Sequence, residues 1–281
     1  MLWRSSLAHV GAILSVLTLV GCTVGASEAD DGNASSSLVA APPVKLRFAK
    51  SEYGGCSSCS TWAGIIEVEN LAYSKDVAVV WKSNSSGSYN WNEQPAKFVR
   101  SIGRNREIWS FSGIHASALQ MAIRYRVSGK EYWDNNGGGD YSGSMGPSDS
   151  GMVSTDAPMG AGLDVAVTGA VASFPARGHS GNGLTVDILV RNLNPTKKVE
   201  LVYTTDGWAT VERASAEYRW GNGPDGETWS AHAWFGNASK IEYAVVARQA
   251  ERDAWDNNAR RNFECHAAAG AFTCSGDAFA R

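Results

Sequence analysis

The tetrapeptide Trp-Asp-Asn-Asn occurs twice in this chain, at 133–136 and at 255–258, a spacing of 255 − 133 = 122 residues. Upstream, the pair Asn70-Leu71 recurs as Asn192-Leu193 at the same spacing. Because one spacing holds from residue 70 to residue 136, it indicates a duplicated domain. The chain is therefore expected to fold as two copies of one domain of about 100 residues, each large enough for a core of its own.

Apolar and polar residues alternate in both copies, which is the pattern of half-buried β-strands. Clusters of Ser, Gly and Asn, such as 85–88 and 221–223, separate these stretches and favour turns. No stretch after the N-terminal segment has the period of an amphipathic helix. The sequence predicts an all-β protein with two tandem immunoglobulin-like β-sandwich domains. The predicted inward-facing residues are Ile66, Val68, Val77, Val79, Trp81, Met121, Ile123, Tyr125, Val127, Val186, Ile188, Val190, Val199, Leu201, Tyr203, Tyr243, Val245 and Ala247.

The first 22 residues have the pattern of an export signal. Arg4 precedes an apolar run over 7–20, and the segment Leu-Val-Gly-Cys ends at Cys22. This ending resembles the bacterial lipobox, which implies cleavage before Cys22 and lipidation of its thiol. The protein is then expected at the cell envelope, lipid-anchored in the outer membrane or at the cell surface. An ordinary secretory peptide is the alternative.

Composition sets the expected domain boundaries. Residues 23–43 are rich in Ser, Ala, Gly and acidic residues and are expected to form a disordered tether. A first domain is expected over 44–145, a linker rich in Gly, Ser and Pro over 146–162, and a second, divergent domain over 163–281.

Without Cys22, four cysteines remain in an exported chain. Local pairing predicts disulfides between Cys56 and Cys59 and between Cys265 and Cys274. The Cys-x-x-Cys pair could instead be a redox or zinc motif, but no βαβ pattern and no second ligand pair accompany it. No metal and no cofactor are expected.

Catalytic patterns are missing from the sequence. The five histidines form no spaced cluster, and no Gly-x-Ser-x-Gly, His-Glu-x-x-His or phosphate loop occurs. A net charge of −3 and a pI near 6.0 give no sign of nucleic-acid binding. The chain is expected not to be an enzyme and not to bind nucleic acid.

Tryptophan is abundant, with eleven residues in the chain. Trp81, Trp109 and Trp229 lie in strand-like contexts that favour the core. Trp91, Trp133, Trp208 and Trp255 instead lie beside Asn, Asp and Gly in turn-rich segments. An exposed indole can stack on the apolar face of a sugar ring while neighbouring amides bind its hydroxyl groups. We therefore interpret Asn135 and Asn257 as binding residues, and Asp134 and Asp256 as residues that hold the turns.

Three ordered motifs in the first copy, at 70–77, 89–92 and 125–136, resemble carbohydrate-binding module family 21. This family includes the starch-binding domain of fungal glucoamylase and the glycogen-targeting subunits of protein phosphatase 1. The second copy, about 163–264, shows a weaker resemblance. The resemblance implies an immunoglobulin-like β-sandwich, in agreement with the strand pattern, and binding of starch or glycogen.

The resemblance also implies two binding sites in a module. Site one would use Trp91, Trp133, Asn135 and Asp140, with Ala122 where the family has a tyrosine. Site two would use Tyr73 and Phe98, with Arg106 in place of a third aromatic residue. In the second copy, the implied residues of site one are Trp208, Trp255, Asn257 and Asn262. Pro195 replaces Tyr73 there, and Tyr218 occupies the position of Phe98.

The sequence thus predicts a non-catalytic, lipid-anchored protein that binds α-glucan at the bacterial cell envelope. Its expected partners are an α-glucan polysaccharide or oligosaccharide, the membrane through Cys22 and, as an open candidate, an envelope amylase. The alternative function is an envelope scaffold or adhesin whose β-sandwich domains bind a protein or a different glycan.

Overall fold

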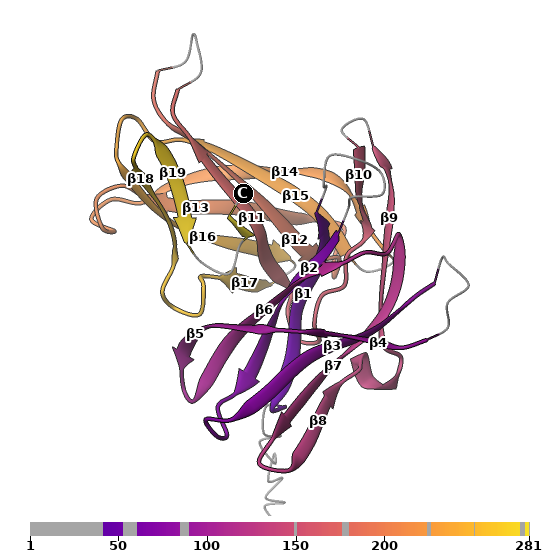
Figure 1. Cartoon of the computed structure of the whole chain (residues 1–281). Helices are drawn as coiled ribbons and strands as arrows, with labels where there is room; N and C mark the ends of the chain where they lie inside the picture. The colour runs from indigo at the N-terminus through magenta and orange to yellow at the C-terminus, as the bar shows by residue number, and fades with distance from the viewer. Residues whose placement is uncertain are drawn as a thin grey trace, which may run out of the picture. The chain divides into compact units, whose positions relative to one another are not determined.

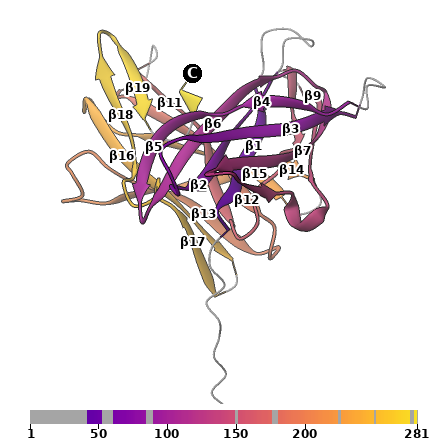
Figure 2. The same ribbon diagram turned by 60° about the horizontal axis from the view of Figure 1, so that its bottom comes forward.

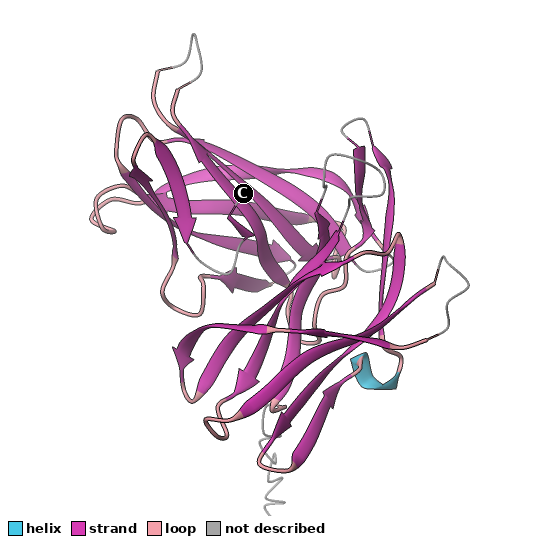
Figure 3. Cartoon of the chain, viewed as in Figure 1, coloured by secondary structure: helices cyan, strands magenta, loops and turns pink. Residues whose placement is uncertain are grey.

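The computed structural model describes residues 42–52, 61–84, 90–148, 151–175, 180–223, 226–249, 251–275 and 279–280. Strands dominate these residues, and the short 3₁₀ turn η1 (Asn136–Gly138) is the helical element among them (Figure 3). No helix in the described part is long and apolar enough to cross a membrane. The prediction of an all-β, sandwich-like fold is confirmed.

The first half contains two antiparallel sheets (Figure 1). One has the strand order β1-β2-β6-β5, and the other has the order β10-β9-β7-β3-β4 with β8 paired to β7. These strands are β1 (Val44–Glu52), β2 (Thr61–Glu69), β3 (Lys75–Ser83), β4 (Asn92–Pro95), β5 (Lys97–Gly103), β6 (Arg106–Ile114), β7 (Ala118–Val127), β8 (Lys130–Asp134), β9 (Tyr141–Ser148) and β10 (Gly151–Asp156).

The second half has one hydrogen-bonded path, β19-β18-β16-β13-β14-β15-β12-β11-β20, with β17 paired to β16 (Figure 2). Its long strand β14 pairs with both β13 and β15. The strands are β11 (Val165–Ser173), β12 (Gly183–Arg191), β13 (Lys197–Thr204), β14 (Glu212–Asn222), β15 (Gly226–Trp234), β16 (Lys240–Gln249), β17 (Arg252–Asp256), β18 (Phe263–Ala268), β19 (Ala271–Ser275) and β20 (Phe279–Ala280).

Each half has its own apolar core, formed by alternate residues of its strands. On β7, Met121, Ile123 and Tyr125 are fully buried, and on β16, Tyr243 and Val245 are fully buried. The remaining predicted inward-facing residues are also buried, except Trp81, which is partly buried and packs against the first core. Burial of these side chains is the main favourable contribution to folding, so the period-2 pattern identified the faces of the strands correctly.

The segment 146–162, predicted as a linker, takes part in the sheet. Strand β9 continues to Ser148, β10 pairs with it, and Met159 forms a β-bridge with Phe48. Glycine is needed here for close packing: a Cβ at Gly146 of β9 would lie 2.6 Å from the Thr155 side chain of β10. The glycine-rich composition therefore reflects close packing within paired strands, and not a flexible connection.

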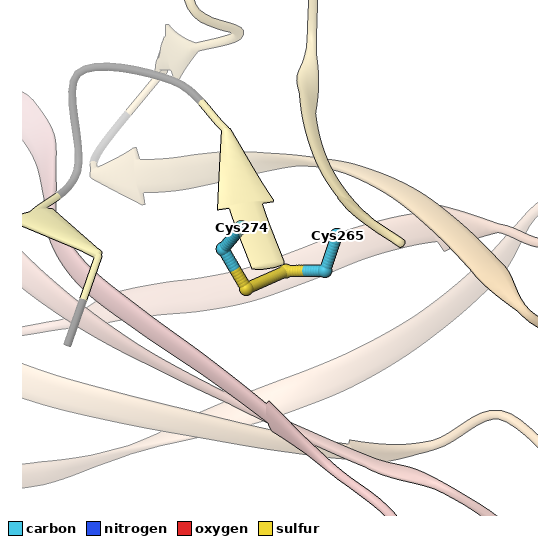
Figure 4. Close-up of a disulfide and its surroundings, with 2 residues drawn as sticks. All are labelled: Cys265 and Cys274. Atoms are coloured by element: carbon cyan, nitrogen blue, oxygen red, sulfur yellow. A yellow bond between two sulfur atoms is a disulfide. The ribbon is translucent and has the colours of Figure 1, made fainter. Parts of the chain in front are cut away.

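A disulfide joins Cys265 of β18 to Cys274 of β19 (Figure 4), with an S–S distance of 2.09 Å. The two residues are also register partners in the β18–β19 hairpin. This confirms one of the two predicted disulfides. Cys56, Cys59, Cys22 and the predicted signal peptide lie outside the described residues, as does most of the predicted tether.

Several contacts of the first half recur in the second half at or near the 122-residue spacing. Lys75 donates to Asn70 and pairs with Glu107 at 2.9 Å, and Lys197 pairs with Asn192 and Glu227 in the same way. Trp109 donates to Glu107 at 3.0 Å, as Trp229 does to Glu227 at 2.8 Å. Residues that repeat in the sequence thus form corresponding contacts in the two halves of the structure.

Candidate functional site

A shallow pocket on the first half brings together all the residues predicted for site one of the first copy. Its lining residues are Val80, Trp91, Ala122, Trp133, Asn135 and Asp140. Register places Val80 of β3 beside Ala122 of β7, and Arg124 of β7 beside Trp133 of β8. The two indoles are about half exposed, at 47% and 46%. Two aromatic planes beside an amide and a carboxylate form a surface suited to stacking on a sugar ring and binding its hydroxyl groups.

The loop that carries Asn135 is held by Asp134. The Asp134 carboxylate accepts hydrogen bonds from the Leu46 N–H at 2.6 Å and from the Tyr141 hydroxyl at 2.9 and 3.0 Å. Burial and the neighbouring Asp134 raise the pKa of Tyr141, which keeps its hydroxyl a donor. Asn135 Oδ1 accepts from the Gly138 N–H at 3.0 Å, so its Nδ2 group is available to donate elsewhere. Asp134 is structural, as the sequence predicted.

Both indoles of the pocket have neighbours that the sequence did not predict. Lys82 Nζ lies 4.8 Å from the centre of the Trp91 ring, a cation–π distance. Trp133 Nε1 donates to Glu131 at 2.8 Å, which fixes the orientation of that ring. Hydrogen bonds from Arg126 and then from Trp133 lower the pKa of Glu131, so this acceptor stays ionised at neutral pH. A ligand that stacks on the face of Trp91 covered by Lys82 must displace that side chain.

A second pocket in the first half brings together the residues predicted for site two. Tyr73 is fully exposed, Phe98 is 53% exposed, and both line it with Asn70, Ala72, Lys75, Glu107 and Trp109. Phe98 and Trp109 meet edge-to-face, with ring centres 6.0 Å apart. The sequence interpretation assigned Trp109 to the core, and the structure shows that it packs against the core and also lines this pocket. The Glu-x-Trp spacing in the sequence could have indicated this position, because Glu107, which also lines the pocket, accepts a hydrogen bond from the indole N–H of Trp109.

Arg106 has a different surrounding from the one expected. Its Nε donates to Glu67 at 2.9 Å and its Nη1 to the Pro42 carbonyl at 2.9 Å. It is not among the residues that line the second pocket. The reason is strand alternation, since Arg106 and Glu107 are adjacent on β6 and point to opposite faces. Arg106 therefore binds Glu67 and the Pro42 carbonyl and does not take the place of the third aromatic residue in the second pocket.

The second half repeats the loop geometry of site one. Asn257 Oδ1 accepts from the Arg260 N–H at 3.0 Å, and the Asn262 N–H donates to the Asn257 carbonyl at 2.8 Å. Asp256 accepts from the Val167 N–H at 2.8 Å, in the way that Asp134 accepts from Leu46. Trp255 is 47% exposed. The loop therefore presents an indole and an amide as the first loop does.

Trp208 is less exposed than its counterpart Trp91, contrary to expectation. It follows Gly207 in a turn, and its own φ is 72°. Its indole Nε1 is buried without a hydrogen-bond partner. Asp206 fixes the turn by accepting from Thr204 and Thr210, and these hydrogen bonds lower the pKa of Asp206 to about 2. Only part of the Trp208 ring is open to a ligand.

Part of the second site-two pattern is also present. Tyr218 and Trp229 meet edge-to-face at 5.9 Å, as Phe98 and Trp109 do. An exposed Pro195 occupies the position of Tyr73, so one stacking ring is missing. The described part of the chain holds no group of three metal-ligating side chains.

Residues 55–143 match the family model of the Carbohydrate/starch-binding module (family 21). The first half holds one starch-binding domain of family 21. Within this family 21 domain lie Trp91, Trp133 and Asn135 of the first pocket and Tyr73 and Phe98 of the second.

Two curated proteins show the extent of the similarity. Glucoamylase 1 of Rhizopus oryzae is 40% identical over 87 residues, which is 29% of this chain and 14% of that enzyme. Protein phosphatase 1 regulatory subunit 3E of Rattus norvegicus is 36% identical over 103 residues, which is 35% of this chain and 36% of that subunit. The chain thus spans a small part of one of these relatives and about a third of the other.

Among solved structures, one is the starch binding domain of Rhizopus oryzae glucoamylase in complex with beta-cyclodextrin and maltoheptaose. It is 35% identical, covers 38% of this chain and 96% of that chain, and has a TM-score of 0.30.

Proposed function

We propose that this protein is a non-catalytic α-glucan-binding protein that holds starch- or glycogen-like chains on its exposed aromatic pockets. The observation that carries this proposal is the first pocket, where Trp91, Trp133 and Asn135 lie together inside the residues matched by family 21. The two indoles are half exposed, and a hydrogen bond to Glu131 orients Trp133, so a sugar ring can stack on them without a change of fold.

The second half is proposed to be a divergent copy that also binds glycan. Support comes from the matched hydrogen bonds of the two Trp-Asp-Asn-Asn loops and from the similar exposure of Trp133 and Trp255. A polymer that contacts both halves would be bound more tightly than by one half, provided that the geometry permits simultaneous contact.

The decisive experiment is retention on insoluble starch, with release by maltoheptaose. We expect the intact protein to be retained and the double variant Trp91→Ala with Trp133→Ala to lose most of the retention that the first half provides. Trp234→Ala is the matched control, because Trp234 is 44% exposed but lines neither pocket. Passage of the intact protein through starch without retention would contradict the proposal and favour a scaffold or adhesin.

The location of the protein is part of the proposal. The lipobox-like sequence that ends at Cys22 supports a lipid anchor at the cell envelope. In that case Cys22→Ala should release the protein from membranes or block its maturation, measured by partition into a detergent phase. Unaltered partition of the variant would contradict the anchor without affecting glucan binding.

A further inference from the structure

The two Trp-Asp-Asn-Asn loops share their backbone but have opposite charge. Loop 133–140 carries two carboxylates, Asp134 and Asp140, and no cation. Loop 255–262 carries one carboxylate, Asp256, and two cations, Arg260 and Arg261. The formal charges are −2 and −1 + 2 = +1, a difference of three. Binding of a neutral glucan does not require this difference in charge, because the glucan offers hydroxyl groups without charge.

No ion pair within the described part of the chain accounts for arginine at these two positions. Both side chains are exposed, and neither forms an ion pair in the described part of the chain. The acidic groups on neighbouring strands are already paired: Lys240 lies 3.0 Å from Glu264 and 3.6 Å from Glu242. In the first half, the equivalent positions are Gly138 and Gly139, where a Cβ would meet open space or ordinary contact. Side chains at these positions thus extend from the loop toward solvent.

Arg260 also occupies an unfavourable backbone position. Its φ is 72°, and the preceding Asn258 and Ala259 have φ values of 53° and 55°. Glycine adopts such angles without strain, and the first loop has Gly137 and Gly138 there, with φ values of 71° and 102°. An arginine that keeps a strained angle and stabilises no neighbour is better explained by contact with a ligand.

We propose that the second half recognises an anionic glycan, with Trp255 stacking on a sugar ring and Arg260 and Arg261 pairing with phosphate or carboxylate groups on the chain. This inference rests on the proposed function in that Trp255 is taken as a sugar-binding surface. Arginine suits the role because its planar guanidinium pairs with carboxylate and phosphate through two parallel hydrogen bonds.

The test compares full-length protein with the variant Arg260→Gly, Arg261→Ala on phosphorylated maltodextrin, polygalacturonate and neutral maltodextrin, by affinity electrophoresis. We expect a loss of at least about tenfold in affinity for one or both anionic glycans and no change for the neutral chain. Binding to the anionic chains should weaken as salt is added, since exposed charges are screened. The phosphate and carboxylate arms distinguish the two sources of charge.

The control is Arg104→Gly, which removes another exposed arginine at positive φ, 48°, from a turn of the first half. Glycine at position 260 relieves strain, so the test variant is expected to fold, and its melting temperature checks this. An equal loss for neutral and anionic chains, or no loss for either, overturns the inference. Equal binding of inorganic polyphosphate or of phosphatidylglycerol vesicles also overturns it. Failure of the proposed function would differ, because neutral maltodextrin would then not bind to the parent protein.

Discussion

The loops at 133–140 and 255–262 have the same hydrogen bonds but different surroundings. In the first loop, Asp134 is partly exposed and Asn136 is exposed. In the second, Asp256 and Asn258 are buried, because Arg47 donates to Asp256 at 3.3 Å and Arg100 donates to the Asn258 side chain. The Trp and the first Asn of each motif are nevertheless left accessible to a similar degree. The difference shows that the repeated motif has two parts, one that holds the turn and one that is free to bind.

The largest expected effect concerns the part that holds the turn. Asp256→Ala should lower the free energy of unfolding by about 3–5 kcal/mol, because it leaves the largely buried Arg47 without one of its carboxylates. Asp134→Ala should cost less, about 1–3 kcal/mol, since that carboxylate accepts hydrogen bonds but pairs with no cation among the described residues. Urea unfolding measures both. A greater loss for Asp134→Ala would show that the second loop is not anchored as described.

A second comparison involves the hairpins formed by the last two strands of the first half and by β18 and β19 of the second half. The β18–β19 hairpin is joined by Cys265–Cys274, whereas the residues of the β9–β10 hairpin include no cysteine. Replacing both cysteines by Ser should lower the free energy of unfolding by about 2–4 kcal/mol, because the unfolded chain loses a constraint. Hydrogen exchange should speed up in β18 and β19 and stay unchanged in β9. An equal change in both hairpins would contradict a local role of the disulfide.

The alternation of residues was sufficient to predict the strands and their buried faces, because period 2 is set by backbone geometry alone. It could not predict β10, because a segment rich in Gly and Ser has no apolar alternation. Its place depends on pairing with β9 and on contacts with other strands, such as the hydrogen bond that the Ser51 N–H of β1 donates to the Ser154 hydroxyl. Edge strands of this kind are determined by tertiary contacts that a single sequence does not display.

The pocket of the first half was predicted in most of its residues, since Trp91, Trp133, Asn135 and Asp140 come together. Contacts between distant segments were not predictable. Lys82 over Trp91, the pairing of Arg106 with Glu67 and the role of Trp109 in the second pocket all depend on strand register. Trp208 and Trp91 looked equivalent in sequence, but a positive φ at Trp208 changes the orientation of its side chain.

That inequality predicts different results for the two tryptophans. Trp91→Ala should weaken binding of maltoheptaose by the first half by roughly 1–3 kcal/mol, the scale of losing an aromatic anchor. The melting temperature should change little, because the ring is half exposed. Trp208→Ala should do the reverse, lowering the melting temperature more than the affinity. Calorimetric titration and thermal unfolding of the same two variants provide the comparison, and a large loss of stability in Trp91→Ala would place that ring in the core.

The smallest expected effect concerns Glu131, which orients Trp133 but has no equivalent beside Trp255. The corresponding Asp253 pairs with Arg248 at 3.2 Å, and Trp255 forms no hydrogen bond through its indole in the described residues. Glu131→Gln should reduce binding at the first pocket by less than about fivefold, and Asp253→Asn should leave binding at Trp255 unchanged.

The pKa of Glu131 is lowered from 4.5 by Arg126, so its ionised form is favoured by the fold. The contribution of ionised Glu131 to the orientation of Trp133 is therefore present above pH 4.5 and is lost as the pH falls through the lowered pKa of Glu131. Binding measured between pH 5 and 8 should thus be constant for the parent protein, and a marked fall within that range would show that another group controls the orientation of Trp133.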